Sequence, residues 1–443
     1  MRIEEIPPFL ISLGKKEGAT DVAVKLEQSD DTMIRFSNNE ITVGKRWHEL
    51  EAEIFVMVEK SRAGTRTGIL SKQNLLSLMK RLVNTAKTSP PSDIYSPLPR
   101  GPFKYDYSLL GPLRIAPRPE KLVGYIEEAI NAARKSGAER VAGSLISSSS
   151  KIMIQTSGGA CAEEKDMGLE ISVRAFCSDV ASGHSVSVAR DESGFDPATA
   201  GRQAGEIARI SLNPEEAQPG RNDTLLGPLV FASLVSQVGD RSSAFFVDSG
   251  LSFLAGKIGS QVASKKLTLY DDPTMKDSYG LRISDDEGIP TKRNTLIQKG
   301  TLKTFLHNST TAKKFGVKTT GNAGLLVPHP WNLVVEPGGK KMEDILSSID
   351  RGIYVTNDWY LRYQDYSKGD FSTIPRDGMF LIKNGELTKP LRNLRISDNM
   401  LRIFENIVET SRERHWVKWW EVEIPTLTPY AFIENLNFSK STM

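Results

Sequence analysis

Hydrophobic and polar positions follow two periods in the first half of the chain. Residues 3–17 and the stretch SKQNLLSLMKRLVNTAK have helical spacing. Between them, DVAVKLEQ, TMIRFSNNEITV and HELEAEIFVMVE alternate with the period of a strand. The same order returns in EKLVGYIEEAINAARKSG, RVAGSLIS, KIMIQTSGGACA, MGLEISVRAFCSD and PATAGRQAGEIARIS. Successive alternating segments predict antiparallel sheets with helices packed on one face.

This repeated order predicts an internal duplication. Its two helix–β–helix units would be residues 1–88 and 119–212, joined by a proline-rich, extended connector at 89–118 that lies on a surface. Polar, turn-rich sequence follows the second unit. We therefore expect an N-terminal domain over 1–212 and a second domain over 222–443.

Strand patterns dominate the second half of the chain. SYGLRISDDEGIPTKRNTLIQKGTLKTFL alternates around two turns at 286–288 and 299–300, where glycine supplies positive φ. A short helix, STTAKKF, is expected to end at Gly316, and a hairpin is expected to turn at 384–385. The prediction is an α+β chain whose C-terminal domain is mainly antiparallel β with a few helices.

One helix stands out at the start of this second domain, PLVFASLVSQVGDR at 228–241. Proline is well placed at its first position, and Gly239 weakens its last turn. The helix has one apolar stripe, made of Phe231, Leu234, Val235 and Val238. Its other side is polar, with Ser233, Ser236, Gln237 and Asp240. The spacing therefore predicts an amphipathic helix packed on a core.

Composition narrows the classes of function. A chain of 443 residues is too long for a single core, and a net charge of +3 is too weak a bias to indicate nucleic-acid binding. No stretch approaches the roughly 20 apolar residues of a membrane span. The opening MRIEEIPPFLISLGKKEG lacks the pattern of a signal peptide. We expect a cytoplasmic protein in which Cys161 and Cys177 are free thiols.

Few other residues suggest chemistry. RERHWVKWW at 412–420 mixes cations with tryptophans and could stack on bases, but an amphipathic strand or a subunit contact is the favoured interpretation. His307, His329 and His415 lack metal-ligand spacing, and the acidic run at 285–287 does not fit an EF-hand and is expected to be a turn. There is no Gly-x-Ser-x-Gly elbow and no Walker lysine.

From about residue 225 onward the chain resembles the TldD/PmbA family. The ordered blocks that carry the resemblance are SDDEGIPTKRNTLIQKGTLKTFLHNSTTAKKFGVKTTGNAG, GIYVTN, KGDFS and GMFLIKNGELTKP. IRFSNNEITVGKRWHELEAEIFVMVEKSRAGTRTG is similar to the family's other domain. The resemblance therefore spans nearly the whole chain and implies one of two subunit types that pair in a zinc-dependent peptidase.

The resemblance also implies what the helix at 228–241 has lost. In the TldD-type subunit it carries His-Glu-x-x-x-His, and a C-terminal cysteine is a further metal ligand. Here Val235 and Asp240 occupy the histidine positions and Ser236 the glutamate position, and no cysteine follows Cys177. A catalytic zinc needs about three protein ligands, and neither valine nor serine supplies one or acts as the base.

We therefore expect the TldE/PmbA-type subunit, with no catalytic residue, metal or cofactor of its own. Its partner would be a TldD-like chain that holds zinc, in a cytoplasmic heterodimer that degrades peptides or unfolded segments. Nucleic acid and membranes are not expected partners. Two alternatives remain open: a self-contained hydrolase with an unrecognised site, and a non-enzymatic binding protein, as the family's association with gyrase modulation suggests.

Overall fold

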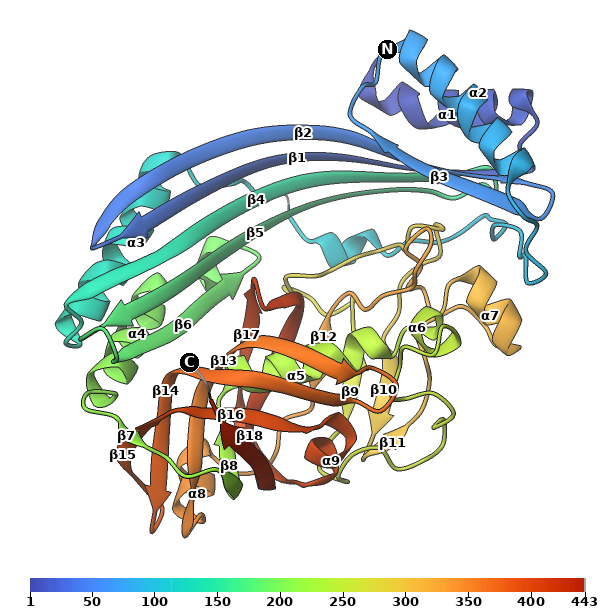
Figure 1. The fold of residues 1–443 in the computed structure, drawn as a ribbon. Coiled ribbons are helices and arrows are strands. Elements are labelled where there is room, and N and C mark those ends of the chain that lie inside the picture. Colours follow the sequence, from blue (N-terminus) through green and yellow to red (C-terminus); the bar gives the residue numbers. More distant parts are fainter. Residues whose placement is uncertain (113, 442–443) are drawn as a thin grey trace.

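A long arched sheet lies over a β-rich body in the computed structural model, which describes residues 1–112 and 114–441 (Figure 1). The first 210 residues build the arch and the helices at its two ends, and the body follows. Of the described helices, none is both long and apolar enough to cross a membrane. The mixed α+β class is as expected.

Two successive sets of helix, three strands and helix build the arch. The first set contains α1 (Ile6–Glu17), β1 (Asp21–Ser37), β2 (Glu40–Val58), β3 (Ser61–Thr67) and α2 (Lys72–Thr88). The second contains α3 (Pro119–Lys135), β4 (Arg140–Thr156), β5 (Cys161–Phe176), β6 (Ser182–Ala189) and α4 (Pro197–Ile210). The order of elements agrees with the order read from the sequence. Superposition of 1–88 on 119–212 stays a prediction.

The six strands form one sheet rather than two. Their order is β3-β2-β1-β4-β5-β6, and every neighbouring pair is antiparallel. The first strands of the two sets therefore pair in the middle, with Leu26 opposite Met153.

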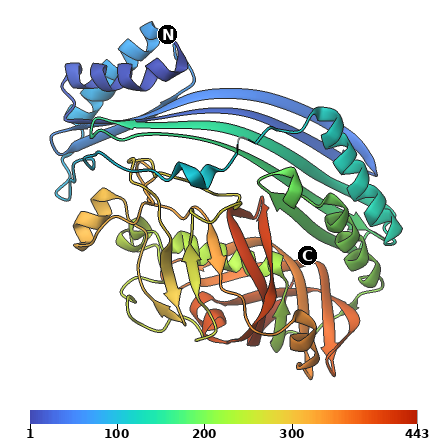
Figure 2. The same cartoon turned by 180° about the vertical axis from the view of Figure 1, so that it is seen from behind.

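Both pairs of helices cover the same face of the arch (Figure 2). At one end Val22, Val24 and Leu26 pack with α1 and α2, and at the other end Ile34 packs with α3 and α4. Because alternate residues of a strand share a face, these even-numbered positions of β1 all point to the helical side. The helix-on-one-face prediction is therefore confirmed. Between the two ends, residues 27–33 are only partly buried.

The proline-rich connector is not simply a surface segment. Leu98 is 1% exposed and packs with Ala23, Phe55 and Leu325, which come from the sheet and from the body. The Tyr105 hydroxyl donates to the carbonyl of Gly288 at 2.8 Å. This part of the connector thus lies between the two halves of the molecule, because Leu98 finds a buried position there.

The body contains the remaining helices and strands. They are β7 (Glu215–Glu216), β8 (Gly220–Leu226), α5 (Pro228–Arg241), α6 (Ala244–Asp248), β9 (Leu269–Asp271), β10 (Asn294–Gln298), β11 (Thr301–Leu302), α7 (Ser309–Phe315), β12 (Leu333–Val335), α8 (Met342–Ser347), β13 (Arg351–Asp365), β14 (Asp370–Lys383), β15 (Glu386–Arg392), β16 (Leu394–Asn399), α9 (Met400–Glu405), β17 (Ile407–Trp419) and β18 (Val422–Lys440).

Five of these strands close a ring. β18 pairs with β8, β8 with β13, β13 with β14, β14 with β16, and β16 with β18 again. Three pairings in the body's sheet are parallel (β8 with β13, β12 with β18 and β7 with β15), so the sheet is mainly antiparallel, as expected. Helix α5 contributes Val230, Phe231, Leu234 and Val235 to the largest hydrophobic cluster of the body.

Several turns of the body and one helix end lie where the sequence predicts them. The turns at 299–300 and 384–385 join β10 to β11 and β14 to β15, and α7 ends at Gly316 in the left-handed region with φ 67°. The strand pattern at 278–293 is wrong in detail, because this stretch holds only an isolated bridge between Ser284 and Pro290. Its backbone is instead ordered by side chains, as described below.

Candidate functional site

Helix α5 is the element that the resemblance makes a candidate site. It begins at Pro228 and packs against β13 and β18. The polar side of the helix is not a solvent-exposed face: Ser233 is 1% exposed and Ser236 is 6% exposed. The helix is enclosed on nearly all sides, and only Gln237, Asp240 and Arg241 near its end reach the surface in part, as does Pro228 at its start.

Gly239 has a packing role rather than ending the helix. The helix continues to Arg241, two residues beyond it. A Cβ at Gly239 would lie 2.4 Å from Cδ1 of Leu333 on β12, well inside van der Waals contact. The glycine therefore lets α5 approach this neighbouring strand closely.

The three positions that the resemblance aligns with the metal motif do not fit zinc. Val235 is fully buried in the hydrophobic core and offers no lone pair. Ser236 offers only a hydroxyl, and the Asp240 carboxylate is 2.5 Å from the Arg241 guanidinium. Across residues 1–112 and 114–441 no three His, Cys, Asp or Glu side chains gather as a metal-holding group. One carboxylate beside an arginine cannot replace the roughly three ligands of a catalytic zinc.

A buried carboxyl group lies beside α5 instead. Asp358 on β13 is 1% exposed, and its Oδ2 accepts from the Ser233 hydroxyl at 3.2 Å and from the Thr373 hydroxyl at 2.8 Å. Its Oδ1 has no hydrogen-bond partner among the described residues. Burial raises the pKa of Asp358 to about 7, so a large part of this group is protonated near neutral pH.

The histidines singled out in the sequence lie in separate places. His307 bonds Thr311 at 3.3 Å, His329 packs on Trp331 with ring centroids 4.2 Å apart, and His415 packs on Tyr430 at 5.8 Å. Burial lowers the pKa of all three, and that of His307 to about 4. They are neutral packing residues rather than a ligand set.

The acidic run at 285–287 orders a turn, as expected. Asp285 accepts backbone N–H bonds from Glu287 at 3.0 Å, Ile289 at 2.8 Å and Ala323 at 3.0 Å. Asp286 lies 3.4 Å from the Arg282 guanidinium. Because backbone donors and arginine occupy these oxygens, little capacity remains for a cation.

A polar network that the sequence did not reveal joins the arch to the body. His184 on β6 is 2% exposed; its Nε2 lies 2.8 Å from Ser172 Oγ on β5, and its Nδ1 lies 3.0 Å from Asn357 Nδ2 on β13. Arg174 pairs with Asp377 at 2.6 Å. The spacing 172 to 184 carries no catalytic signature, so only the folded structure brings these groups together.

The hydrogen bonds decide which nitrogen of His184 carries the proton. Asn357 Nδ2 also donates to Asp377 Oδ2 at 3.2 Å, which sets the amide orientation. His184 Nδ1 must then accept, and Nε2–H donates to Ser172. Burial lowers the pKa of His184 to about 4. The imidazole is neutral, but its proton faces the hydroxyl, so it cannot take a proton from Ser172 in this arrangement.

The cation-rich stretch at 412–420 forms the second part of β17 and the first residue of the turn to β18. Its cations bind within the protein: Arg412 to the Gly339 carbonyl, Arg414 to the Val335 carbonyl, and Lys418 to Glu170 at 2.8 Å. Trp419 is 3% exposed, whereas Trp420 is 56% exposed. The stretch is therefore a β17 strand with one exposed indole, and not a continuous surface for bases.

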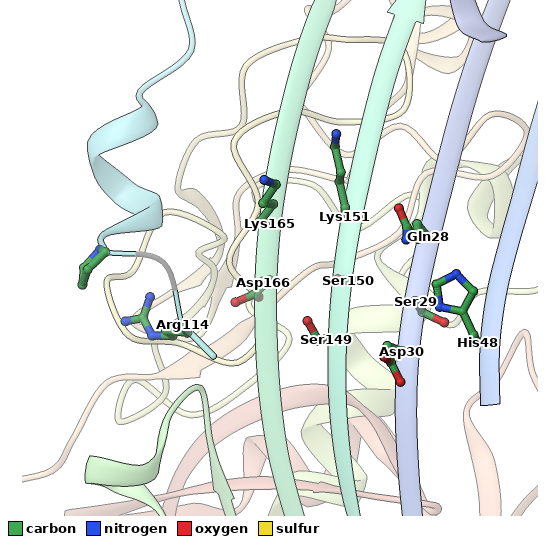
Figure 3. A pocket seen from close by; sticks show the side chains of 11 residues that line it. Gln28, Ser29, Asp30, His48, Arg114, Ser149, Ser150, Lys151, Lys165 and Asp166 are labelled. Carbon is green, nitrogen blue, oxygen red and sulfur yellow. The ribbon is translucent and has the colours of Figure 1, made fainter. Parts of the chain in front are cut away.

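A hollow of about 310 Å³ lies at the middle of the arch, where neither helix pair covers the strands (Figure 3). Its lining comes from four strands and the connector: Gln28, Ser29, Asp30, His48, Pro112, Arg114, Ser149, Ser150, Lys151, Lys165 and Asp166. Most of the charged groups are already paired. Asp30 binds Arg46 at 2.6 Å, and Lys151 lies 3.3 Å from both Glu4 and Glu163. The hollow is polar and holds no arrangement of nucleophile and base.

Comparison with known proteins places the chain in a family. The model of the PmbA/TldA metallopeptidase C-terminal domain matches residues 219–440, about half of the chain, and the model of the central domain matches 115–212. A metalloprotease TldD homolog from Buchnera aphidicola subsp. Acyrthosiphon pisum is 32% identical over 213 residues. The aligned part covers 46% of this chain and 44% of that relative, so the likeness spans less than half of either protein.

A further relative and a solved structure agree with this placement. Metalloprotease PmbA of Escherichia coli O157:H7 is 28% identical over 223 residues, which is 47% of this chain and 45% of that protein. The crystal structure of TldE from Thermococcus kodakarensis superposes with a TM-score of 0.84 at 23% identity, covering 98% of this chain and 99% of that one. At that identity the likeness shows a shared fold. The chain therefore belongs to the PmbA/TldD family.

Proposed function

We propose that this chain is the TldE-type, metal-free subunit of a cytoplasmic zinc metallopeptidase that degrades peptides or unfolded segments. A single observation carries the proposal: Val235, Ser236 and Asp240 on α5 cannot hold a metal, while the surrounding fold is that of the family. The catalytic zinc and its activated water then belong to a TldD-like partner.

The exposed strand edges of the arch support a role in assembly. β3 pairs with β2 only from Ala52 onward, so within the part of the chain that the structure describes residues 40–51 of β2 pair with β1 and with no further strand. Ile41 and Val43 on this edge are 41% and 46% exposed. A long uncovered edge is a site where another chain can add, and proteins usually keep such edges short or covered.

Co-expression with a TldD-like chain that carries His-Glu-x-x-x-His tests the proposal. We expect a heterodimer on size-exclusion chromatography with an interface of about 2,000 Å² or more, as in obligate complexes. Zinc analysis should find the metal only when the partner is present, and peptide cleavage should need the partner. A chain that stays monomeric beside the partner, or that binds stoichiometric zinc alone, would overturn the proposal.

The Ser172–His184 contact makes a self-contained hydrolase the second candidate. Two observations argue against this hydrolase: His184 carries its proton on Nε2, and its ring is buried. We expect Ser172→Ala to leave the peptidase activity of the complex unchanged. Cleavage by the purified chain alone that is abolished in Ser172→Ala would favour the hydrolase. A chain that assembles with no peptidase would instead favour a non-enzymatic binding protein.

A further inference from the structure

An exposed aromatic cluster with two arginines that have no carboxylate partner among the described residues lies on the body, and we call it the aromatic platform. It consists of Trp359, Tyr360, Arg362, Arg376 and Trp420. Arg362 donates to the Leu361 carbonyl at 2.8 Å. Tyr360 is 37% exposed and Trp420 is 56% exposed. The Trp420 ring centroid lies 5.2 Å from that of Trp359 and 6.0 Å from that of Tyr360.

A β-bulge builds the platform. The pairing of β13 with β14 shifts register between Trp359 and Arg362, and Tyr360 sits in the left-handed region with φ 59°. A bulky residue with positive φ is strained, and bulges redirect side chains near functional sites. The Tyr360 N–H donates to Glu421 Oε1 at 2.9 Å, which holds the bulge against the turn that carries Trp420.

Buried groups anchor the bulge from behind. Thr373 Oγ1 lies 3.0 Å from the Trp359 carbonyl and 2.8 Å from Asp358. Trp359 packs with Leu229 and Trp419 in a cluster that includes the first turns of α5. The strained segment is therefore fixed in place, and its exposed rings are preorganised rather than free to collapse.

The platform's arginines have no carboxylate of their own. Arg362 lies 5.9 Å from the Tyr360 ring centroid, and Arg376 lies 5.3 Å from that of Trp359. Both are exposed, and neither forms an ion pair with any residue that the structure describes. Arg376 also lines a hollow of about 380 Å³ between arch and body, with Arg174, Ile374 and Leu391. Two exposed guanidinium groups thus lie beside aromatic rings, and one of them, that of Arg376, also borders a partly apolar hollow.

We propose that the aromatic platform binds peptide segments that combine an acidic side chain with a bulky apolar one. The proposal rests on the peptide-degrading role above and gives that role a substrate preference. Either Arg362 or Arg376 would bind the carboxylate in a bidentate manner, while Trp420 and Tyr360 cover the apolar side chain. Trp, Tyr and Arg are also the residues that dominate binding energy at protein surfaces.

A peptide fits this surface better than a nucleic acid does. A strand of phosphates needs a track of cations, whereas the platform has only two arginines without a carboxylate partner among the described residues, and Glu421 and Glu423 lie in the adjoining turn. The neighbouring cations Arg412, Arg414 and Lys418 are bound within the protein. An isolated carboxylate matches this charge arrangement.

Fluorescence anisotropy on the full-length chain tests the proposal. The probe is a fluorescein-labelled twelve-residue peptide that alternates Glu, Phe and Ser. Matched probes replace Glu by Lys or Phe by Ser, and a labelled oligo-dT of twelve nucleotides is the nucleic-acid arm. We expect binding of the Glu-Phe peptide, at least about tenfold weaker binding of each matched peptide, and no binding of oligo-dT at physiological salt.

Two platform variants and one control locate the binding. Trp420→Ala and the double variant Arg362→Gln/Arg376→Gln should each weaken Glu-Phe peptide binding about tenfold or more. All these side chains are exposed, so circular dichroism should remain unchanged. Arg293→Gln removes a comparable cation–ring contact elsewhere on the body, where Arg293 lies 3.5 Å from the Tyr270 ring centroid, and this variant should bind as the wild type does.

Three results would overturn the proposal. One is equal binding of the Lys and Glu peptides, another is binding of oligo-dT in preference to peptide, and the third is unchanged peptide binding in both platform variants. The heterodimer is measured in parallel by size-exclusion chromatography. If the platform variants lose the TldD-like partner instead of the peptide, the surface is a subunit interface, and the proposed function survives while this inference fails.

Discussion

The Ser233 hydroxyl on α5 donates to the Asp358 carboxyl on β13, across 3.2 Å and at full burial. This bond ties the helix that would carry the metal motif to the strand that carries the aromatic platform. The same carboxyl oxygen accepts from Thr373, and the other oxygen has no hydrogen-bond partner among the described residues. A buried carboxyl group with hydrogen bonds to only one of its oxygens should affect the pH dependence of stability.

Asp358 should make the folded state less stable as the pH rises. Its pKa is raised by burial from 3.8 to about 7, so between these values the unfolded chain has released a proton that the folded chain still holds. Stability is therefore lost from about pH 4 to about pH 7, by roughly 4 kcal/mol at most. Asp358→Asn should remove this slope. Urea unfolding of both proteins at pH 5 and pH 8 measures this slope. If the free energy of unfolding changes by the same amount between the two pH values in both proteins, the prediction is wrong.

Asp377 should show the opposite sign. Burial alone would raise its pKa, but Arg174, His184 and Ser182 together hold it below the ordinary value. A depressed pKa contributes stability above the unfolded value and loses it as the pH falls. We expect Asp377→Asn to cost about 3 kcal/mol at pH 7 and less in acid, since it leaves Arg174 unpaired at the interface. The same unfolding series provides the test, and a constant difference would refute it.

Gly239→Ala should destabilise the protein even though alanine favours helices. Its Cβ would lie 2.4 Å from Cδ1 of the buried Leu333, an overpacking that costs about 1–3 kcal/mol. Gly124→Ala on α3 is the matched control, because a Cβ there meets no atom within 4 Å. It should stabilise by about 0.5–1 kcal/mol. Thermal unfolding should therefore shift in opposite directions, and two shifts of the same sign would refute the packing argument.

Installing the missing motif should not create a peptidase. Val235→His, Ser236→Glu and Asp240→His together still lack a third protein ligand, and the imidazole at 235 would enter a fully buried apolar position. We expect a loss of a few kcal/mol and little zinc. Zinc titration and a peptide-cleavage assay check this, with Val235→Ala as the control for core packing alone. Stoichiometric zinc and cleavage without a partner would mean that the chain is a recently silenced enzyme.

Residues 1–212 and 222–443 are expected to fold as separate units. The three largest hydrophobic clusters each lie within one half, and several contacts between the halves are polar, such as the Arg282–Glu164 and Lys418–Glu170 pairs. Each piece expressed alone should give a cooperative unfolding transition by circular dichroism. If either piece is unfolded, the boundary is not a domain boundary.

The sequence by itself determined the order of elements in the arch, the turns at 299–300 and 384–385, and the end of α7 at Gly316. These features depend on residue spacing and on backbone freedom within a few positions. That Val235 offers no donor atom to a metal can likewise be read from the sequence, because the absence of a lone pair requires no knowledge of folding.

Tertiary structure alone decided the rest. It joined the strands of two successive segments into one sheet, buried Ser233 against Asp358 from 125 positions away, and placed His184 beside Asn357 from 173 positions away. The strained Tyr360 and its ring partner Trp420 also lie on different strand pairs. Local periodicity reports which face of one element is apolar. It does not report which other element covers that face, because this choice is made by packing between distant segments of the chain.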